Sequence, residues 1–484
     1  MTDTQREREL KFDLPDTWEL PDVSRFVPEG GSVQHETQRL ESTYFDTAGR
    51  DLFGSLVTLR RRTGDADNGW HLKIPMDGAR QEIRLPLEGS RGVPAELRTL
   101  TAGLRGRAAL RTIATLRTER EVRRIVDAEG AGLAEIVHDT VTATVKHEFS
   151  VIRSWHEAEV ELLGDVKGSG GDEKLLARIA TWLGKYGAEP SASMSKLGRA
   201  LEASAHPARP TSTAAGVIGA YLNTNFAAIV AGDVTLRRDA AVALAVDELH
   251  DSIHATRVAS RRYRSTLRIF AAMLDGERAA ALDAELSWFA AALGEVRDRH
   301  VLRRHLDAAF DELAAELVVG PVRRRVGRTL DAEEAAARAG LNEVMASARY
   351  IALLAELRNW TADLPVHDFD EPAVSLERLV RKASRTMDKR IAAAQEASTD
   401  DAAYHRARKA AKRARYAGEL AIPVMGKAAR QLAKQAKKRQ ELLGDRQDEV
   451  VAAEFLLRLG TSGGNGFTLG VLHQRQRALA ESGG

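Results

Sequence analysis

The sequence predicts an α+β protein of two domains, in which an antiparallel β-sheet domain precedes an all-α, internally duplicated helical bundle. Three observations favour this fold class: an apolar/polar alternation of period two through the first 200 residues, apolar residues three and four apart beyond them, and a non-periodic stretch rich in proline and serine between the two. A chain of 484 residues is long enough for two domains that each bury a core.

Alternation of period two defines the strands of the first domain. It is clearest in four segments, at 57–62, 70–74, 81–85 and 158–162, each bounded by turn-forming residues. Helical spacing appears instead at about 94–104 and 173–186. We therefore expect an antiparallel sheet with flanking helices over residues 1–203.

A change of composition marks the boundary and the second domain. Residues 204–213 carry proline, serine and threonine without periodicity, which predicts a linker. Residues 214–480 are rich in alanine, leucine and arginine with helical spacing. The segment 254–264 also aligns with 405–415, and each is followed about forty residues later by Leu-Gly and an acid, at Leu293-Gly294 and Leu443-Gly444. This spacing predicts a duplicated helical-hairpin unit.

The composition is that of a globular protein, with 44% apolar and 29% charged residues. The chain has no cysteine, which excludes disulfides and thiolate metal sites and fits a reducing compartment. The first residues are polar, unlike a signal peptide, and we expect no apolar run long enough to cross a bilayer. The sequence therefore predicts a cytoplasmic protein without a membrane partner.

Three charged residues alternate near the N-terminus, at Glu7, Glu9 and Lys11. On a β-strand, all three would point to one face. Glutamate oxygens suit hard ions such as Mg²⁺ or Mn²⁺, and the lysine could bind the phosphate that such an ion accompanies. A solvated edge strand is the alternative interpretation.

The other strands extend this charged face. If each keeps its period, acids and bases share the inward side of the sheet, namely Glu7, Glu9, Glu82, Glu157, Glu159 and Glu161 with Lys11, Arg60, Arg62, Lys73 and Arg84. Clustered carboxylates need cations and clustered bases need an anion, so a metal-bound oligophosphate would satisfy both. The alternative is a solvated sheet face on which opposite charges pair across strands.

An ordered series of motifs in residues 1–205 resembles the CYTH domain, or triphosphate tunnel metalloenzyme. The series comprises Glu7-x-Glu9-x-Lys11, Tyr44-Phe45-Asp46-Thr47, Leu59-Arg60-Arg61-Arg62, Leu72-Lys73, Glu157-x-Glu159-x-Glu161 and Ser195-Lys196. The resemblance implies an eight-stranded antiparallel tunnel in which acids bind Mg²⁺ or Mn²⁺ and bases hold a triphosphate.

The resemblance also implies residue roles. Metal ligands would be Glu7, Glu9, Glu135, Asp139, Glu157, Glu159 and Glu161. Substrate would be bound by Lys11, Arg60, Arg62, Lys73, Glu82, Arg84, Arg117, Arg120 and Lys196, and the catalytic group would comprise Glu7, Glu9, Lys11, Lys73 and Lys196. Arg117 and Arg120 are three residues apart, so a regular strand cannot direct both inward.

Such a site would activate water to attack the terminal phosphorus and hydrolyse a phosphoanhydride. A nucleotidyl cyclase or a thiamine triphosphatase is the alternative chemistry on the same scaffold. Tripolyphosphate, nucleoside triphosphate, thiamine triphosphate and longer chains all offer similar phosphates, and the sequence does not choose among them.

The helical half carries two basic helix faces. One stripe contains His250, His254, Arg257, Arg261, Arg264 and Arg268, and the second repeats it with His405, Arg408, Lys412 and Arg415. Like charges three and four residues apart destabilise a helix slightly, which favours an external anion. An arginine-rich surface paired with acids elsewhere is the alternative, and a metal role for the histidines is a lesser one because they stand among cations.

These helices, with the two Leu-Gly-x-x-x-Asp segments, resemble the CHAD domain, the conserved histidine α-helical domain, from about residue 214 to 479. The resemblance implies a duplicated bundle that binds inorganic polyphosphate through His250, His254, Arg257, Arg261, Arg262, Arg264, Arg268, His405, Arg408, Lys409, Lys412, Arg413, Arg415, Lys434 and Lys438. The basic helices have few aromatic residues for base stacking, which favours a polyanion without bases over nucleic acid.

The leading hypothesis is therefore a metal-dependent tripolyphosphatase tunnel followed by a polyphosphate-binding module that concentrates chains near it. The competing hypothesis is a binding protein without turnover, in which the tunnel holds an anion and the helices dock on polyphosphate bodies.

Overall fold

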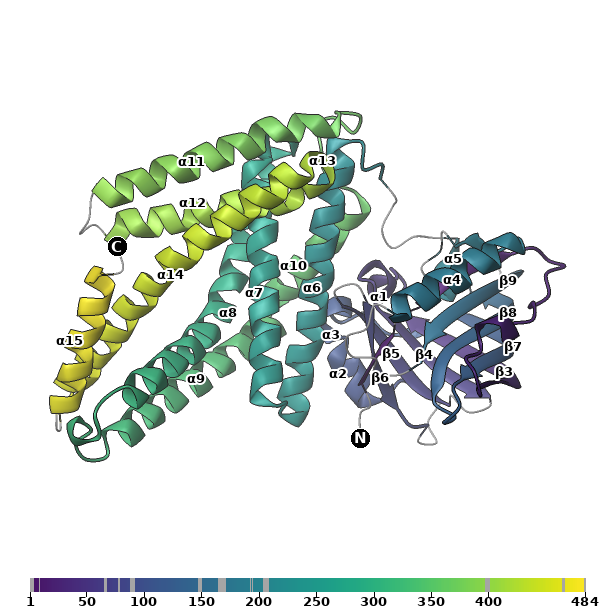
Figure 1. The fold of residues 1–484 in the computed structure, drawn as a ribbon, viewed down its shortest axis with the longest axis horizontal. Helices are drawn as coiled ribbons and strands as arrows, with labels where there is room; N and C mark the ends of the chain where they lie inside the picture. Colours follow the sequence, from purple (N-terminus) through teal and green to yellow (C-terminus); the bar gives the residue numbers. More distant parts are fainter. Residues whose placement is uncertain are drawn as a thin grey trace. The chain divides into compact units, whose positions relative to one another are not determined.

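The computed structural model describes residues 4–7, 9–64, 68–76, 79–87, 92–146, 150–163, 171–191, 193, 195–202, 209–396, 401–463 and 466–482. The chain forms two compact units, Met1–His206 and Pro207–Gly484, each considered by itself (Figure 1). Residues 204–208 of the predicted linker at 204–213 lie outside the described residues.

The first unit is built on one antiparallel sheet. Its strands are β1 (Thr4–Glu7), β2 (Glu9–Leu14), β3 (Ser32–Asp46), β4 (Thr58–Gly64), β5 (Gly69–Met76), β6 (Ala79–Leu85), β7 (Arg111–Val126), β8 (Gly132–Val145), β9 (Val151–Leu162) and β10 (Glu189–Pro190). Their order across the sheet is β1-β6-β5-β4-β3-β7-β8-β9-β2-β10. The four segments in which the sequence predicts strands correspond to β4, β5, β6 and β9.

The sheet closes on itself through its N-terminal segment. β1 pairs with β6 and β2 pairs with β9, yet a single residue, Arg8, separates the two strands in the chain. The two sides of the sheet must therefore meet along this segment, which makes the sheet a barrel. With β1 and β2 taken as one strand and the two-residue β10 left aside, the barrel has the eight strands that the resemblance implies.

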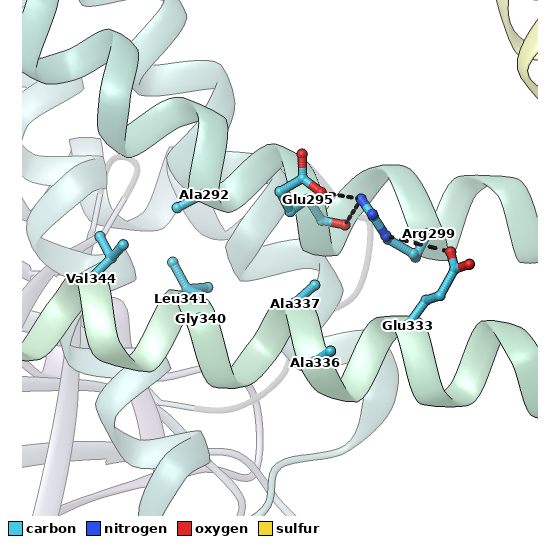
Figure 2. A pocket seen from close by; sticks show the side chains of 9 residues that line it. All are labelled: Ala292, Glu295, Arg299, Glu333, Ala336, Ala337, Gly340, Leu341 and Val344. Atoms are coloured by element: carbon cyan, nitrogen blue, oxygen red, sulfur yellow. Dashed lines mark hydrogen bonds and ion pairs between the residues drawn. The ribbon is translucent and has the colours of Figure 1, made fainter.

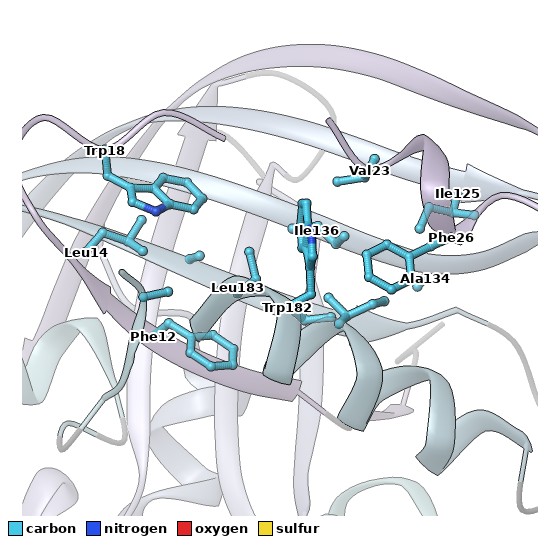
Figure 3. Close-up of a cluster of buried hydrophobic side chains, with 14 residues drawn as sticks. Phe12, Leu14, Trp18, Val23, Phe26, Ile125, Ala134, Ile136, Trp182 and Leu183 are labelled. Atoms are coloured by element: carbon cyan, nitrogen blue, oxygen red, sulfur yellow. The ribbon is translucent and has the colours of Figure 1, made fainter. Parts of the chain in front are cut away.

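Helix α4 (Gly171–Lys185) covers part of the outer wall, where the outward residues of β2, β8 and β9 are apolar. Phe12, Ile136 and Val160 pack with Trp182 and Leu183 of α4 in one buried cluster (Figure 3). Because this apolar core lies between the outer wall and α4, the inside of the barrel can be lined by charged side chains.

A second apolar cluster includes residues from the ends of the long strands and from α5 (Lys196–Leu201). Tyr44, Val141 and Trp155 pack there with Leu197 and Leu201. Three short helices complete the unit, α1 (Asp51–Gly54), α2 (Ala95–Leu100) and α3 (Ala102–Arg105). The helices predicted near 94–104 and 173–186 are thus α2 with α3, and α4.

The second unit is mainly helical, with two isolated β-bridges, Thr213 with Pro372 and Leu274 with Val366, among its described residues. Its helices are α6 (Ala214–Val242), α7 (Val246–Ile269), α8 (Gly276–Asp311), α9 (Val322–Ala346), α10 (Ala348–Ala362), α11 (Leu376–Glu396), α12 (Asp401–Leu420), α13 (Ile422–Met425), α14 (Lys427–Thr461) and α15 (Phe467–Ser482). Helices α6 to α9 pack in sequence, and so do α11, α12, α14 and α15. The two series repeat one another, so the predicted duplication and fold class are confirmed.

Helix α6 is long and apolar enough to cross a membrane, contrary to the expectation that no apolar run reaches this length. Its most apolar 18-residue window is 61% buried inside the structure. Phe226, Ile229, Val230 and Val234 are fully buried, and α6 packs against α7, α10 and α12. These contacts make it a core helix of the second unit.

Candidate functional site

Three rows of charged residues cross neighbouring strands of the barrel. Glu9 of β2 is opposite Glu161 of β9, and Glu161 is opposite Glu135 of β8. The next inward row pairs Lys11 with Glu159. The third row is entirely acidic, with Asp13 opposite Glu157 and Glu157 opposite Asp139. Because adjacent strands lie only about 4.8 Å apart, the residues of each row are neighbours.

Lys196 joins two of these rows. Its ammonium Nζ lies 2.9 Å from Asp139, 2.6 Å from Glu157 and 2.8 Å from Glu159. Ser195 caps α5 by accepting a hydrogen bond from the Gly198 N–H, which places Lys196 at the first helical position. The Ser195-Lys196 motif thus both starts the helix and directs an ammonium at three acids.

Lys11 and Arg120 complete the neutralisation of the same acids. Lys11 donates to Glu159 at 2.6 Å, and Arg120 makes a bidentate pair with Asp139 at 2.8 and 2.7 Å. Arg120 also reaches Glu159 at 3.1 Å. Three cations therefore face three carboxylates, all of them at least four-fifths buried.

These contacts outweigh the cost of burial. Burial alone would raise the pKa of Glu159, but Lys11, Lys196 and Arg120 hold it well below its usual value. Lys196 and Arg120 similarly lower the pKa of Asp139 against the effect of burial, while the acids raise the pKa of Lys196. All three groups are charged at neutral pH.

A second group of charges surrounds Glu82, a 1% exposed carboxylate of β6. Arg84 donates to it at 2.6 Å, and His71 Nδ1 lies 3.1 Å from Oε1. Arg60 and Lys73 approach within 3.7 Å. Although burial opposes ionisation, His71, Lys73 and Arg60 lower the pKa of Glu82 far below its usual range. Donors from β4, β5 and β6 thus converge on one buried carboxylate.

Arg62 and Tyr44 link this group to Lys196. The Arg62 Nε donates to Ser42 Oγ at 3.1 Å, and Arg62 is buried. Burial would raise the pKa of the Tyr44 hydroxyl, but Arg60, Arg62 and Lys196 together lower it. The two charged groups therefore act on one tyrosine inside the same barrel.

Tyr44 and His71 were not predicted as site residues. His71 shares the parity of Lys73 on β5, and Tyr44 is opposite Arg60 in the β3–β4 register. The alternation that predicted Lys73 as an inward residue also predicts an inward His71, so this residue could have been found from the sequence. Asp46 of the same Tyr44-Phe45-Asp46-Thr47 motif is structural, since it accepts the backbone N–H groups of Thr47, Leu52 and Phe53.

The prediction of an inward Arg117 is wrong. Its side chain is 79% exposed and pairs with Glu41 at 2.9 Å, whereas Arg120 faces inward. β7 keeps its register between the two residues, so the regular pleat directs them to opposite faces.

The acids predicted as metal ligands divide into two sets. Asp139, Glu157 and Glu159 are the acids paired with Lys196, and Glu135 is paired with Arg124 at 2.7 Å. The side chains of Glu7 and Glu9 lie outside the described residues. Among the side chains that the structure describes, no group of three acids, histidines or cysteines is arranged to hold a metal ion.

A hard divalent cation nevertheless fits the row formed by Glu9, Glu135 and Glu161. The register sets these three glutamates opposite one another on adjacent strands, and carboxylate oxygens suit Mg²⁺ and Mn²⁺. Glu135 is paired with one base, Arg124, whereas Lys196 and Arg120 both bond acids in the row containing Glu157, so that row fits less well.

In the helical unit, the two basic stripes meet between α7 and α12. Arg257 and Arg261 of α7 act electrostatically on Lys412 of α12, and Arg408 acts on Arg261. The Nε atoms of Arg261 and Arg408 are buried without a hydrogen-bond partner among the described residues. The duplicated helices thus combine their cations in one cluster, which we call the α7–α12 cluster and define as Arg257, Arg261, Arg408 and Lys412.

The first Leu-Gly-x-x-x-Asp segment provides the acid beside this cluster. Arg257 donates to Asp298 at 2.8 and 3.4 Å. A Cβ at Gly294, one turn earlier on α8, would lie 3.2 Å from Arg257 Nη2. Gly294 therefore leaves the space in which the guanidinium reaches Asp298. In the second copy, Gly444 belongs to the stretch 444–447, whose surroundings lie outside the description.

Other predicted polyphosphate ligands are paired within the protein. Glu419 accepts from Arg262 and Arg415, and Asp283 accepts from Arg264 and Arg268. Periodicity could not reveal the pairs of Arg262, Arg264 and Arg268, because their acids come from other helices, whereas Arg415 and Glu419 are four residues apart on α12. Lys409, Arg413, Lys434 and Lys438 are exposed.

The three histidines predicted to bind polyphosphate lie in two different surroundings. His250 is buried, lies 3.1 Å from Glu334 and stacks on His300 with 3.6 Å between ring centroids. Burial and neighbouring cations lower the pKa of His254 and of His405. His254 and His405 belong with the α7–α12 cluster, whereas His250 belongs to the packing of α7, α8 and α9.

A pocket of about 440 Å³ lies between α8 and α9 (Figure 2). Its lining includes three alanines, Leu341 and Val344, and Arg299 bridges Glu295 and Glu333 at one end. None of the predicted site residues lines it.

Comparison with known proteins agrees with this architecture. The model of the CYTH domain matches residues 5–170, and that of the CHAD domain matches residues 220–457. A relative from Mycobacterium tuberculosis (strain ATCC 25618 / H37Rv), named "Uncharacterized protein Rv2226", is 32% identical over 499 residues, covering 98% of this chain and 93% of the relative.

Two solved structures share part of the fold. The crystal structure of the CHAD domain from the plant Ricinus communis is 27% identical and covers 55% of this chain and 86% of its own, with a TM-score of 0.44. PptA from Streptomyces chartreusis is 21% identical and covers 56% of this chain and 96% of its own, with a TM-score of 0.47. With the two domain matches and the full-length relative together, this chain belongs to the family of proteins in which a CYTH domain is followed by a CHAD domain.

Proposed function

We propose that the CYTH barrel hydrolyses inorganic triphosphate, or a related triphosphate, with Mg²⁺ or Mn²⁺, and that the CHAD unit binds inorganic polyphosphate. The observation that carries the enzymatic part is the convergence of two complementary groups in one barrel. Arg60, Lys73 and Arg84 meet at Glu82, and a row of glutamates crosses β2, β9 and β8.

The bases of the barrel would bind the phosphates, and its glutamates would bind the cation. Arg60, Arg62, Lys73 and Arg84 offer donors for phosphate oxygens, since guanidinium groups bind them in a bidentate manner. Lys11 and Lys196 would approach the same anion from the opposite group of charges. The row of Glu9, Glu135 and Glu161 would hold the cation, which neutralises phosphate charge and activates water when bound. The barrel wall keeps these groups in place and limits access of bulk solvent.

Release of phosphate from tripolyphosphate tests the enzymatic proposal. The initial rate should depend on Mg²⁺ or Mn²⁺ and fall by about a hundredfold in Glu9→Gln, because a metal ligand or its charge is lost. Glu41→Gln is the matched control, since Glu41 lies on the outer face with Arg117. Release that persists in a metal chelator, or an equal loss in the two variants, would contradict the proposal.

One observation favours the second candidate, a tunnel that holds an anion without turnover. Asp139, Glu157 and Glu159 are neutralised by Lys196, Lys11 and Arg120, so these acids need no metal. Binding of tripolyphosphate by folded wild-type protein without phosphate release, with either ion, would support this candidate. A cyclase would instead release pyrophosphate from a nucleoside triphosphate, and a thiamine triphosphatase would prefer thiamine triphosphate in a substrate panel.

The polyphosphate part rests on the α7–α12 cluster. Arg257 pairs with Asp298, Arg408 acts on Arg261 and Lys412, and two of the guanidinium Nε groups have no partner among the described residues. A linear polyanion would supply the missing acceptors. We expect both activities in the cytoplasm, and association with polyphosphate bodies would follow from this cluster.

A further inference from the structure

Lys412 stands in an unusual place for a lysine. It is one turn after Arg408 on α12, which packs against α7, and Arg257 and Arg261 of α7 act on it electrostatically. Asp298 of α8 is the acid that acts on it, and this carboxylate already accepts from Arg257. Three guanidinium groups thus oppose one carboxylate around the amine.

The other elements packed on α12 do not compensate for these cations. In the described residues, α11 and α14 meet α12 through Met387, Leu432 and Ala436. Arg415, one turn after Lys412, is engaged with Glu419 at 2.8 Å and with Gln440 at 3.5 Å. Toward α6, Glu419 also accepts from Tyr221. The nearest acid on this side is therefore already bonded to Arg262, Arg415 and Tyr221.

Burial, followed by the effects of Arg408, Arg261 and Arg257, lowers the pKa of Lys412 to about 7. An arginine would remain charged in the same surroundings, whereas a lysine can lose its proton. A bound phosphate chain would reverse the local field and favour the ammonium. The protonated fraction of Lys412 would therefore differ between the free and the bound protein.

We propose that the CHAD unit binds polyphosphate together with about one proton at mildly alkaline pH, and that Lys412 is the group that takes it up. The inference rests on the proposed polyphosphate site and adds a regulation to it. By linkage, affinity should be highest below about pH 7 and fall as pH rises, approaching tenfold per pH unit while the free amine is neutral and the bound one is charged.

The two histidines of the cluster titrate in a different range. His254 and His405 have pKa values below the usual 6.5, so both are neutral above pH 7 in the free protein. Bound phosphate raises the pKa of these histidines as well, so their proton uptake would add to the effect mainly toward the acidic end of the range. The comparison of wild type with Lys412→Arg between pH 7.5 and 9 therefore isolates Lys412.

The experiment is calorimetric titration of the full-length protein with long-chain inorganic polyphosphate, without divalent metal so that no hydrolysis occurs. At pH 8, buffers of different ionisation enthalpy give the number of protons taken up per site. We expect nearly one proton for the wild type and nearly none for Lys412→Arg. Between pH 7.5 and 9, affinity should fall about twentyfold in the wild type and less than about twofold in this variant.

Lys382→Arg is the matched control, because Lys382 is an exposed lysine of α11 and should leave the wild-type behaviour unchanged. Thermal unfolding of each variant shows that it is folded. Binding without proton uptake, or equal uptake in wild type and Lys412→Arg, overturns this inference alone. Absence of any binding from pH 7.5 to 9 overturns the proposed polyphosphate site and the inference with it.

Discussion

Glu82 shows at the scale of a residue how the barrel interior tolerates charge. It is 1% exposed and is surrounded by Arg60, His71, Lys73 and Arg84. Removing one member of a buried ionic group costs far more than the group contributes as a whole, because the remaining charges lose their partner. The bases around Glu82 would then depend on an external anion.

We therefore expect Glu82→Gln to lower the free energy of unfolding by about 3 kcal/mol. Added tripolyphosphate should restore much of this loss, since it can replace the missing negative charge. Thermal unfolding with and without the ligand measures both effects. A variant as stable as the wild type, or one that tripolyphosphate stabilises less than the wild type, would contradict this account of the site.

Lowered acid pKa values predict the pH dependence of the same unit. The folded-state pKa values of Glu82 and Glu159 lie below the usual 4.5, so their stabilising effect is fully present above about pH 4.5 and is lost as pH falls through the lowered values. Unfolding midpoints measured from pH 6 to pH 3 should therefore decline, and less steeply in Glu82→Gln, which has one such group fewer. A parallel decline in both proteins would argue against the role of Glu82.

Much of the site was predictable at this scale because a strand has a fixed period. Alternation placed Lys11, Arg60, Lys73, Glu82 and Glu159 on one face, and the structure brings them into the barrel. The same period showed that Arg117 and Arg120 cannot both point into the barrel, but it did not show which of them does. The pairs of Arg264 with Asp283 and of Arg262 with Glu419 could not be predicted from the period, since each joins two different helices.

At the scale of elements, α7, α8 and α9 meet where the buried His250 stacks on the partly buried His300. Burial lowers the pKa of His250, and burial with the proximity of His250 and Arg297 lowers the pKa of His300 to about 4. Unfolded histidines bind protons near pH 6.5, so between about pH 6.5 and 4 the unfolded state takes up more protons than the folded state. Acidification in this range therefore destabilises the helical unit.

Replacing one ring should reduce this sensitivity. We expect the unfolding temperature of the wild type to fall from pH 7 to pH 5, and to fall less in His300→Gln, which cannot gain a charge there. Calorimetric scans at several pH values resolve the transition. An identical pH dependence in the two proteins would show that His300 does not cause it.

Gly294 connects helix packing to the proposed polyphosphate site. An alanine there would gain about 1 kcal/mol of helix propensity but would press on the Arg257 guanidinium. We expect Gly294→Ala to keep or raise stability and to weaken polyphosphate binding about threefold, through a displaced charge-assisted donor.

Gly327→Ala on α9 is the control for this change. A Cβ at Gly327 would meet no atom within 4 Å, so the variant should gain stability without altering affinity. Equal affinities for both variants and the wild type would indicate that the position of Arg257 does not matter for binding.

Strands and helices were predictable because their patterns are local in the sequence. The closure of the sheet into a barrel was not predictable in this way. The strands near 57–62, 70–74 and 81–85 and the duplicated helices follow from period and repetition. The pairing of β1 with β6 and of β2 with β9 joins residues far apart in sequence, and only the resemblance to known tunnels suggested it. The apolar length of α6 was missed because alanine and glycine interrupt its run of large side chains.

For the whole molecule, two compact units each have their own core and their own group of charges. The helical unit would gather polyphosphate and raise the concentration of chains or chain ends available to the barrel. The central claim is nevertheless about the barrel. Its mixed charges form a site for a metal-bound triphosphate and are not simply a set of internal ion pairs.

Direct binding of tripolyphosphate with and without Mg²⁺ tests this claim, in wild type and in the double variant Arg60→Ala/Lys73→Ala. We predict that Mg²⁺ strengthens binding to the wild type and that the double variant binds at least about tenfold more weakly, because two phosphate donors are lost. Affinity that is unchanged by the metal and by the loss of both bases would contradict it.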